Sequence, residues 1–278
     1  MNVGVGLPNT VPGTDGELII EWAKQADAGP FSTIAVLDRI VYDSYDPFTA
    51  LAAAAAVTER ARLATMVAIG PLRNTAIMAK LAGSVAALCG GRMTLGLGVG
   101  ARQDDFEVSG VELRGRGNRL SEQLAYMRSE WRDSAIGPAA ARETQLELLV
   151  GGGSGPAFAR MARYADGYAH GGGPPRAFAS AVGRARAAWA DHGRPGNPRL
   201  WGQAYFALGD ADAGADYLRD YYAFAGPFAE KVAAGNLDSA RAIKDLVRGY
   251  EEEGCDELVL LPTVPDIGQL DRLADVIG

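Results

Sequence analysis

The sequence contains few of the residues from which proteins build metal centres and disulfide frameworks. Among its 278 residues there are two cysteines, Cys89 and Cys255, and two histidines, His170 and His192. Their spacing matches neither a metal-ligand motif nor a framework of paired cysteines. We therefore expect no bound metal ion, and we expect a protein of the reducing cytoplasm.

The chain also lacks long apolar runs and an excess of basic residues. No apolar run approaches the ~18 residues that a membrane-spanning helix needs, and no basic segment precedes the apolar residues at the N-terminus. Acidic residues number 34 and basic residues 27, so the surface repels polyanions. We therefore expect a small-molecule substrate as the partner, and neither nucleic acid nor a membrane.

Short runs rich in Val, Ile and Leu alternate with longer segments of helical periodicity, which is typical of parallel βα units in an α/β protein. Strands are expected over 3–7, 33–37, 63–69, 93–98, 146–150, 167–170, 200–208 and 257–261. Helices are expected over 17–28, 47–59, 75–88, 118–132, 155–165, 175–191, 211–250 in several pieces, and 266–277. Eight units predict a closed (β/α)₈ (TIM) barrel, a single domain over residues 1–278, with extra helices in the seventh unit.

A glycine-rich run follows the fifth expected strand, from Gly151 to Pro156, with Ser154 inside it. Consecutive backbone N–H groups at the start of a helix form a concave nest that binds phosphate. The same run also suits an ordinary strand-to-helix turn in which Ser154 caps the helix. The residues alone leave these two alternatives open.

Another glycine cluster, Gly96-Leu97-Gly98-Val99-Gly100, ends the fourth expected strand. Missing side chains there either let a flat ligand lie against the backbone or relieve crowding inside the barrel. The spacing differs from the G-x-G-x-x-G fingerprint of dinucleotide-binding folds. We therefore expect no dinucleotide-binding site of that kind at this cluster.

Three polar residues stand at the C-terminal ends of expected strands, where barrel enzymes place catalytic groups. Asp38 and Arg39 follow the second strand, and His170 ends the sixth. Asp38 and Arg39 are candidates for catalysis, or for ion pairs with each other or with a neighbour. His170 is a candidate for proton transfer, or for a hydrogen bond to a loop backbone. We expect Arg39 to affect turnover more than folding.

An ordered series of segments resembles the luciferase-like monooxygenase superfamily, which includes bacterial luciferase, alkanesulfonate monooxygenase and deazaflavin-dependent reductases. The segments that carry the resemblance are 46–51, 58–63, 71–74, 79–80, 88–92, 95–100, 104–107 and 117–120, with Glu122. The resemblance covers nearly the whole chain and implies the barrel fold. It also implies a flavin at the C-terminal ends of the strands.

In relatives with FMN, the loop after the fifth strand holds the phosphate, and the ring lies above a bulge with a non-proline cis peptide on the third strand. The fourth strand's end lines the ribityl chain and phosphate. The resemblance therefore implies cofactor contacts from Met66, Val67, Gly98, Val99, Gly100, Ala101, Gly152, Gly153 and Ser154.

The chain departs from the family at two places. Bacterial luciferase has a catalytic histidine just past its second strand, where this sequence has Arg39. The segment 131–145 is shorter than in many relatives, which predicts a more open site.

The resemblance implies an oxidoreductase. The leading expectation is a monooxygenase that uses O₂ and reduced FMN supplied by a separate flavin reductase, with electrostatic stabilisation from Arg39 and proton transfer at His170. The alternative is a reductase or dehydrogenase that uses the deazaflavin coenzyme F420. The third reading is a flavin-binding protein without turnover. A homodimer fits the family.

Overall fold

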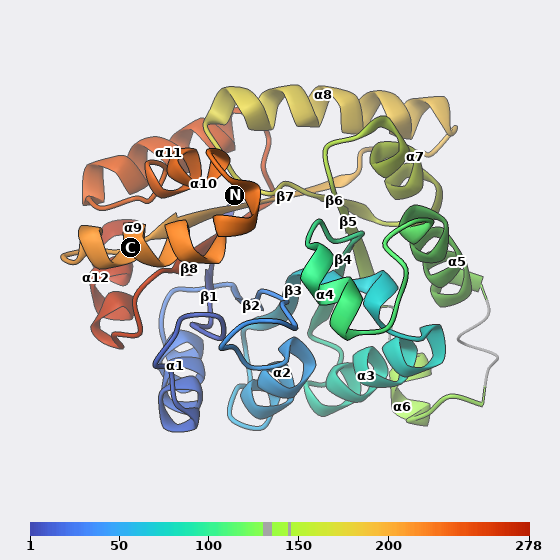
Figure 1. Ribbon diagram of the computed structural model, residues 1–278, viewed down its shortest axis with the longest axis horizontal. Coiled ribbons are helices and arrows are strands. Elements are labelled where there is room, and N and C mark those ends of the chain that lie inside the picture. Colours follow the sequence, from blue (N-terminus) through green and yellow to red (C-terminus); the bar gives the residue numbers. More distant parts are fainter. Residues whose placement is uncertain (130–134, 144–145) are drawn as a thin grey trace.

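The computed structural model describes residues 1–129, 135–143 and 146–278. Its parallel strands form a closed barrel in which each strand pairs with the next and β8 pairs with β1 (Figure 1). The strands are β1 (Asn2–Gly6), β2 (Thr33–Val36), β3 (Arg62–Ile69), β4 (Met93–Gly98), β5 (Glu147–Gly151), β6 (Gly167–Ala169), β7 (Arg199–Phe206) and β8 (Glu257–Pro262). The predicted (β/α)₈ barrel is confirmed.

Helices surround the barrel, with α1 to α3 along its lower side and α8 along its upper side in Figure 1. The helices of the eight units are α1 (Gly16–Ala28), α2 (Pro47–Ala55), α3 (Thr75–Leu88), α5 (Arg116–Ser129), α7 (Gly155–Tyr164), α8 (Pro175–Asp191), α11 (Ala240–Glu252) and α12 (Gly268–Ile277). Within the described ranges, none of the helices combines the length and apolar character needed to cross a membrane.

The helices differ from the prediction in three details. Helix α2 ends at Ala55, earlier than predicted, and just beyond it the Val57 N–H and the Thr58 hydroxyl both donate to the Ala54 carbonyl, at 3.1 and 2.8 Å. Two short helices were not expected, α4 (Gln103–Val108) and α6 (Ala139–Glu143). The end of the predicted helix 118–132, and part of the segment 131–145 predicted to be short, lie outside the described residues.

The seventh unit contains the predicted extra helices. They are α9 (Ala211–Tyr221), a 3₁₀ turn (Ala223–Ala225) and α10 (Phe228–Ala233), which precede α11. Their presence lengthens the connection from β7 to β8, and it places α9 close to the barrel interior.

Buried side chains form two clusters, because successive residues of a strand face opposite sides of the barrel wall. On β6, Tyr168 belongs to the outer cluster beneath the helices, and Ala169 belongs to the inner cluster. The inner cluster also contains Tyr217 and Tyr221 of α9, together with Tyr205 of β7. Helix α9 therefore packs its tyrosines against the residues that fill the barrel.

Candidate active site

The third strand carries the predicted irregularity. The peptide bond between Met66 and Val67 is cis, and the pairing of β3 with β4 shifts register between Thr65 and Ala68. Met66 is buried in the inner cluster, and Val67 packs against that cluster while remaining partly exposed. The bulge thus presents an aliphatic side chain at the end of the strand.

Glycines on two neighbouring strands make room for Val67. A Cβ atom at Gly98 would lie 2.8 Å from Val67 Cγ2, and one at Gly96 would lie 3.0 Å from Val67 Cγ1. At Gly151 the corresponding distance to Val67 Cγ2 is 3.3 Å. We call Val67 with these three glycines the Val67 ledge. The glycines leave room for the Val67 side chain, as one of the two alternatives predicted, and contact of this surface with a flat ligand stays a prediction.

The residues that connect β4 to α4 adjoin this ledge. Val99 and Gly100 are partly exposed and Ala101 is exposed. Gly100 has a φ of 72°, and a Cβ there would lie 2.6 Å from Ile69 Cγ2, so only glycine suits the position. Arg116 holds the loop by donating from Nε to the Gly100 carbonyl, at 3.1 Å. Contact of residues 98–101 with a flavin side chain stays a prediction.

A glycine loop, residues 152–154, follows the ledge directly and is exposed. Gly152 has a φ of 122°. Ser154 is the N-cap of α7, and its hydroxyl oxygen accepts from the Ala157 N–H at 3.4 Å. The capping role of Ser154 is therefore present, and the partial positive charge of the helix N-terminus is directed at this loop.

Arg184, which the sequence did not suggest, lies beside the glycine loop. Its Nη1 donates to the Gly153 carbonyl at 2.9 Å, and its guanidinium lies 4.8 Å from the centroid of the Phe158 ring. The residue projects from the middle of α8. Its closeness to the loop depends on how α8 packs on α7, and no sequence motif marks it.

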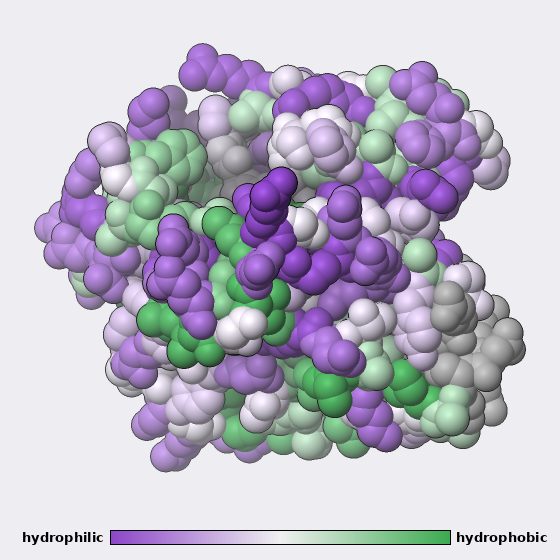
Figure 2. Space-filling model, turned by 45° about the vertical axis from the view of Figure 1, so that its right-hand side comes forward, coloured by the Kyte–Doolittle hydropathy of each residue, from purple (hydrophilic) through white to green (hydrophobic). Residues whose placement is uncertain are grey.

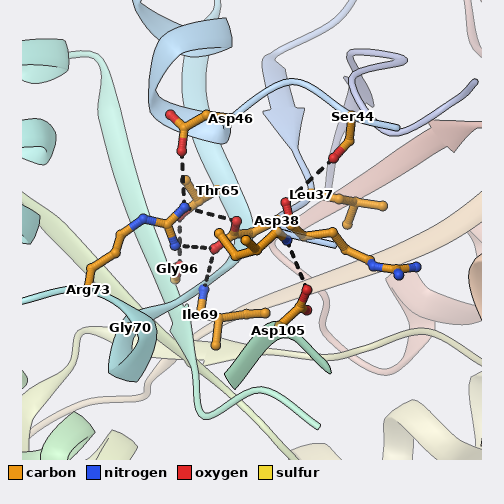
Figure 3. Close-up of polar contacts among 12 residues, drawn as sticks. Leu37, Asp38, Ser44, Asp46, Thr65, Ile69, Gly70, Arg73, Gly96 and Asp105 are labelled. Carbon is orange, nitrogen blue, oxygen red and sulfur yellow. Dashed lines mark hydrogen bonds and ion pairs between the residues drawn. The ribbon is translucent and has the colours of Figure 1, made fainter. Parts of the chain in front are cut away.

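Asp38 is engaged by Arg73, as Figure 3 shows. Arg73 Nη1 and Nη2 donate to the two carboxylate oxygens at 2.5 and 3.0 Å, and the Ile69 N–H donates to one of them at 2.7 Å. Burial raises the pKa of Asp38, while Arg73 opposes the rise. Burial alone lowers the pKa of Arg73, but its hydrogen bonds to Asp38 raise it overall. Of the predicted alternatives, Asp38 thus pairs with a neighbour, and this pair fixes the end of β3.

Arg39 is buried, and it is bound to the loop after β2 and to the end of α9. Its Nη1 donates to the Tyr221 carbonyl at 3.1 Å, and its Nη2 donates to the Val41 carbonyl at 2.7 Å. The guanidinium lies 4.2 Å from the centroid of the Tyr42 ring and 5.0 Å from that of Tyr221. Burial lowers its pKa. The contacts give Arg39 a positioning role, and its catalytic role stays a prediction.

His170 faces the helices. Like Tyr168 two residues earlier, its side chain lies on the outer side of the wall, 5.5 Å from Phe178 and 6.4 Å from Tyr250 between ring centroids. Among the described residues, neither ring nitrogen has a partner in strict hydrogen-bond geometry, and the loop backbone that acts on the ring is that of Gly172. Burial lowers its pKa, although the nearby Gly172 backbone opposes this. Proton transfer at His170 stays a prediction.

The tyrosines around α9 are the part of the mouth that the sequence interpretation missed. Tyr217 and Tyr221 lie four residues apart on one helix face, a spacing that could have revealed them. The Tyr217 hydroxyl is 2.8 Å from the Thr10 hydroxyl. The Tyr205 hydroxyl is 2.7 Å from that of Tyr222. These contacts hold α9 against the barrel.

The fold and the site define a (β/α)₈ barrel with an apolar ledge and a glycine-rich loop at the C-terminal ends of its strands. The sequence profile of the luciferase-like monooxygenase family matches residues 1–260, and the chain belongs to this family. The uncharacterized protein Rv0940c of Mycobacterium tuberculosis is 35% identical over 196 residues, which cover 58% of this chain and 68% of that protein.

Solved structures share the fold at low sequence identity. An F420-dependent secondary alcohol dehydrogenase, in complex with an F420–acetone adduct, matches with a TM-score of 0.81 and 16% identity, over 99% of this chain and 98% of that one. The oxygenating constituent of 3,6-diketocamphane monooxygenase from Pseudomonas putida, in complex with FMN, matches with a TM-score of 0.74 and 15% identity, over 100% and 96% of the two chains.

Proposed function

We propose that the protein is a monooxygenase that uses reduced FMN and O₂ to oxidise a small organic substrate. The observation that carries this proposal is the continuity of the Val67 ledge with the glycine loop. Gly151 borders Val67, and Ser154 lies three residues further along the chain. Three residues span at most about 10 Å, which suits the ribityl chain between a flavin ring and its phosphate.

The residues at the two ends of this span fit the two ends of the cofactor. A Cβ atom at Gly98 or at Gly96 would lie within 3.0 Å of the Val67 side chain. The lack of a side chain at both positions therefore leaves space beside Val67 for the flavin ring. At the other end, backbone N–H groups at the start of α7 and the Arg184 guanidinium offer positive charge to a phosphate. When bound, the flavin supplies the redox chemistry.

Monooxygenation is favoured over alcohol dehydrogenation by the state of Asp38 and His170, two of the predicted catalytic candidates. Removal of hydride from an alcohol also requires a base for the hydroxyl proton. Asp38 is held by Arg73, and His170 faces the helices. Oxidation by reduced flavin and O₂ makes a smaller demand on a side-chain base, so this site suits it better.

Cofactor retention and oxygen transfer together test the proposal. The protein is mixed with FMN and with coenzyme F420 in turn, and the retained cofactor is identified by absorption and mass spectrometry. Turnover with a flavin reductase under ¹⁸O₂ should then place ¹⁸O in the product. Selective F420 retention with hydride transfer would support the deazaflavin alternative. FMN retention without turnover on any substrate would support a binding protein, and retention of neither cofactor would overturn the proposal.

A further inference from the structure

Two arginines meet where the loop after β2, the start of α4 and the end of α9 come together. Arg39 and Arg102 both donate to the Tyr221 carbonyl, at 3.1 and 3.3 Å. Their side chains are only 4% and 11% exposed. Burial, and next the charge of Arg102, lower the pKa of Arg39, because two like charges repel each other. The pair therefore favours a negatively charged group beside it.

Asp104 is the charged group that lies against both arginines. Its carboxylate accepts from Arg102 Nη2 at 2.6 Å and lies 4.0 Å from Arg39 Nη2. It also accepts from the Asp105 N–H at 2.9 Å. Burial alone would raise the pKa of Asp104, but the hydrogen bond from Arg102 lowers it overall, so the carboxylate is charged near neutral pH. Because its side chain is 41% exposed, Asp104 can turn toward the solvent while the arginines stay in place.

A second carboxylate, that of Asp105, is fixed in the same cluster. It is fully buried, and one of its oxygens accepts from the Ile40 and Val41 N–H groups at 3.0 and 2.7 Å (Figure 3). Its other oxygen lies 3.6 Å from Arg102 Nε. Asp105 therefore holds the loop after β2 and cannot follow Asp104 into the solvent. If Asp104 turns away, two guanidinium groups face a single carboxylate.

The arginines also have more N–H groups than the surrounding residues accept. Each guanidinium carries five N–H donors. Arg39 donates to the Tyr221 and Val41 carbonyls, and Arg102 donates to the Tyr221 carbonyl and to Asp104. Within the described part of the chain, the Nε atom of each arginine is buried and has no partner in hydrogen-bond geometry. The pair thus has donors left for the oxygens of a bound anion.

Apolar side chains lie on the exposed side of this cluster. The centroid of the Phe224 ring is 4.4 Å from the Arg102 guanidinium, and Phe224 is 45% exposed. Ile40 and Val41, whose N–H groups bind Asp105, are 41% and 40% exposed. The space-filling view shows hydrophobic residues directly beside strongly hydrophilic ones near the centre of the molecule (Figure 2). A ligand at this cluster would meet positive charge and apolar surface together.

We propose that Arg39 and Arg102 form a binding site for an organic carboxylate with an apolar body, and that Asp104 fills this site while no ligand is bound. The incoming carboxylate would accept the hydrogen bond from Arg102 that Asp104 now accepts, and Asp104 would turn toward the solvent. The apolar body would pack against the three exposed apolar side chains. The proposal goes beyond the proposed function and does not depend on a bound flavin, because none of these residues belongs to the Val67 ledge or to the glycine loop.

The test is a ¹⁹F NMR titration of the protein with para-fluorobenzoate, with para-fluorobenzamide as its neutral counterpart. The carboxylate should bind about tenfold more tightly than the amide, as a hydrogen bond between charged groups requires. Asp104→Asn removes the competing charge and should tighten carboxylate binding about threefold, a gain that a purely structural Asp104 would not give. Arg102→Leu should weaken carboxylate binding about tenfold.

Asp266→Asn is the matched control for Asp104→Asn and should leave the affinity unchanged. Asp266 also accepts from an arginine, Arg272, at 2.6 Å and from a backbone N–H at 3.0 Å. Four results would overturn the site: no binding of para-fluorobenzoate, equal binding of the amide, unchanged or weaker carboxylate binding in Asp104→Asn, or loss of binding in Arg184→Leu rather than in Arg102→Leu. Melting temperatures accompany each variant, and Asp104→Asn decides the question if Arg102→Leu fails to fold.

Discussion

The guanidinium of Arg39 donates a hydrogen bond of 3.1 Å to the carbonyl oxygen of Tyr221, a residue 182 positions further along the chain. This bond joins the loop after β2 to the C-terminal end of α9. A carbonyl at the end of a helix has no partner within the helix, so an external donor stabilises it. Arg39 therefore fastens α9 and its tyrosines to the mouth of the barrel.

We predict that Arg39→Leu lowers the free energy of unfolding by roughly 2–3 kcal/mol, because charge-assisted bonds to the Tyr221 and Val41 carbonyls are lost. Arg39→Lys should lower it less, since Lys keeps the charge without the planar fork. Urea unfolding measures both. Arg241→Leu is the control, because Arg241 is 93% exposed. An unchanged stability in Arg39→Leu would instead leave Arg39 free to act on turnover, as the sequence predicted.

At the glycine loop, Ser154→Asp should weaken FMN binding at least tenfold, ~1.4 kcal/mol. Aspartate caps helices as well as serine does, so α7 should persist while the new carboxylate repels the phosphate. Fluorescence titration with FMN measures the affinity. Ser239→Asp makes the same change at the N-cap of α11 and should leave it unaltered. Equal affinity in Ser154→Asp and wild type would place the phosphate elsewhere.

The barrel could be predicted because its signals are local. Alternation of short apolar runs with helical periods marks each βα unit, and even the short strand at Gly167–Ala169 was found. The position of the cis peptide at Met66–Val67 came from the resemblance alone. No local pattern in those two residues distinguishes them from an ordinary strand.

The candidate site was less predictable because its contacts join distant segments. Asp38 pairs with Arg73, 35 residues away, and Arg184 of α8 donates to the Gly153 carbonyl, 31 residues earlier in the chain. The side of the barrel wall on which the His170 side chain lies could not be predicted, for a different reason. A strand residue faces inward or outward according to its parity, and sequence alone did not determine that parity for a three-residue strand.

The Val67 ledge should not tolerate a methyl group at Gly98. Gly98→Ala brings a Cβ to 2.8 Å from Val67 Cγ2 and must displace either the side chain or the strand. We expect FMN affinity to fall at least tenfold while the barrel still folds, as circular dichroism would show. Gly183→Ala on the exposed face of α8 meets no atom within 4 Å and should be neutral or slightly stabilising. Full FMN affinity in Gly98→Ala would show that the ring does not lie on the ledge.

Substitution of His170 should distinguish an effect on the stability of the fold from an effect on the turnover rate. Burial lowers its pKa in the folded protein below the ordinary value of 6.5. A lowered pKa means that protonation is less favourable in the folded state than in the unfolded state. The stability linked to neutral His170 is therefore fully present above about pH 6.5, and it is lost as the pH falls through the lower folded value.

Replacement of His170 by Phe should keep the aromatic packing with Phe178 and Tyr250 while it removes the titrating ring. We expect His170→Phe to lose less stability than the wild type when the pH falls from about 7 to 5, measured as the melting temperature at each pH. His192→Asn, at the exposed end of α8, controls for removal of a histidine. If His170 carries a proton during turnover, its substitution should lower the rate about 10²-fold. If its side chain only packs against the helices, substitution should lower the rate less than tenfold. A 10²-fold loss in His170→Asn, with FMN affinity unchanged, would contradict the structural role and restore His170 to the reaction.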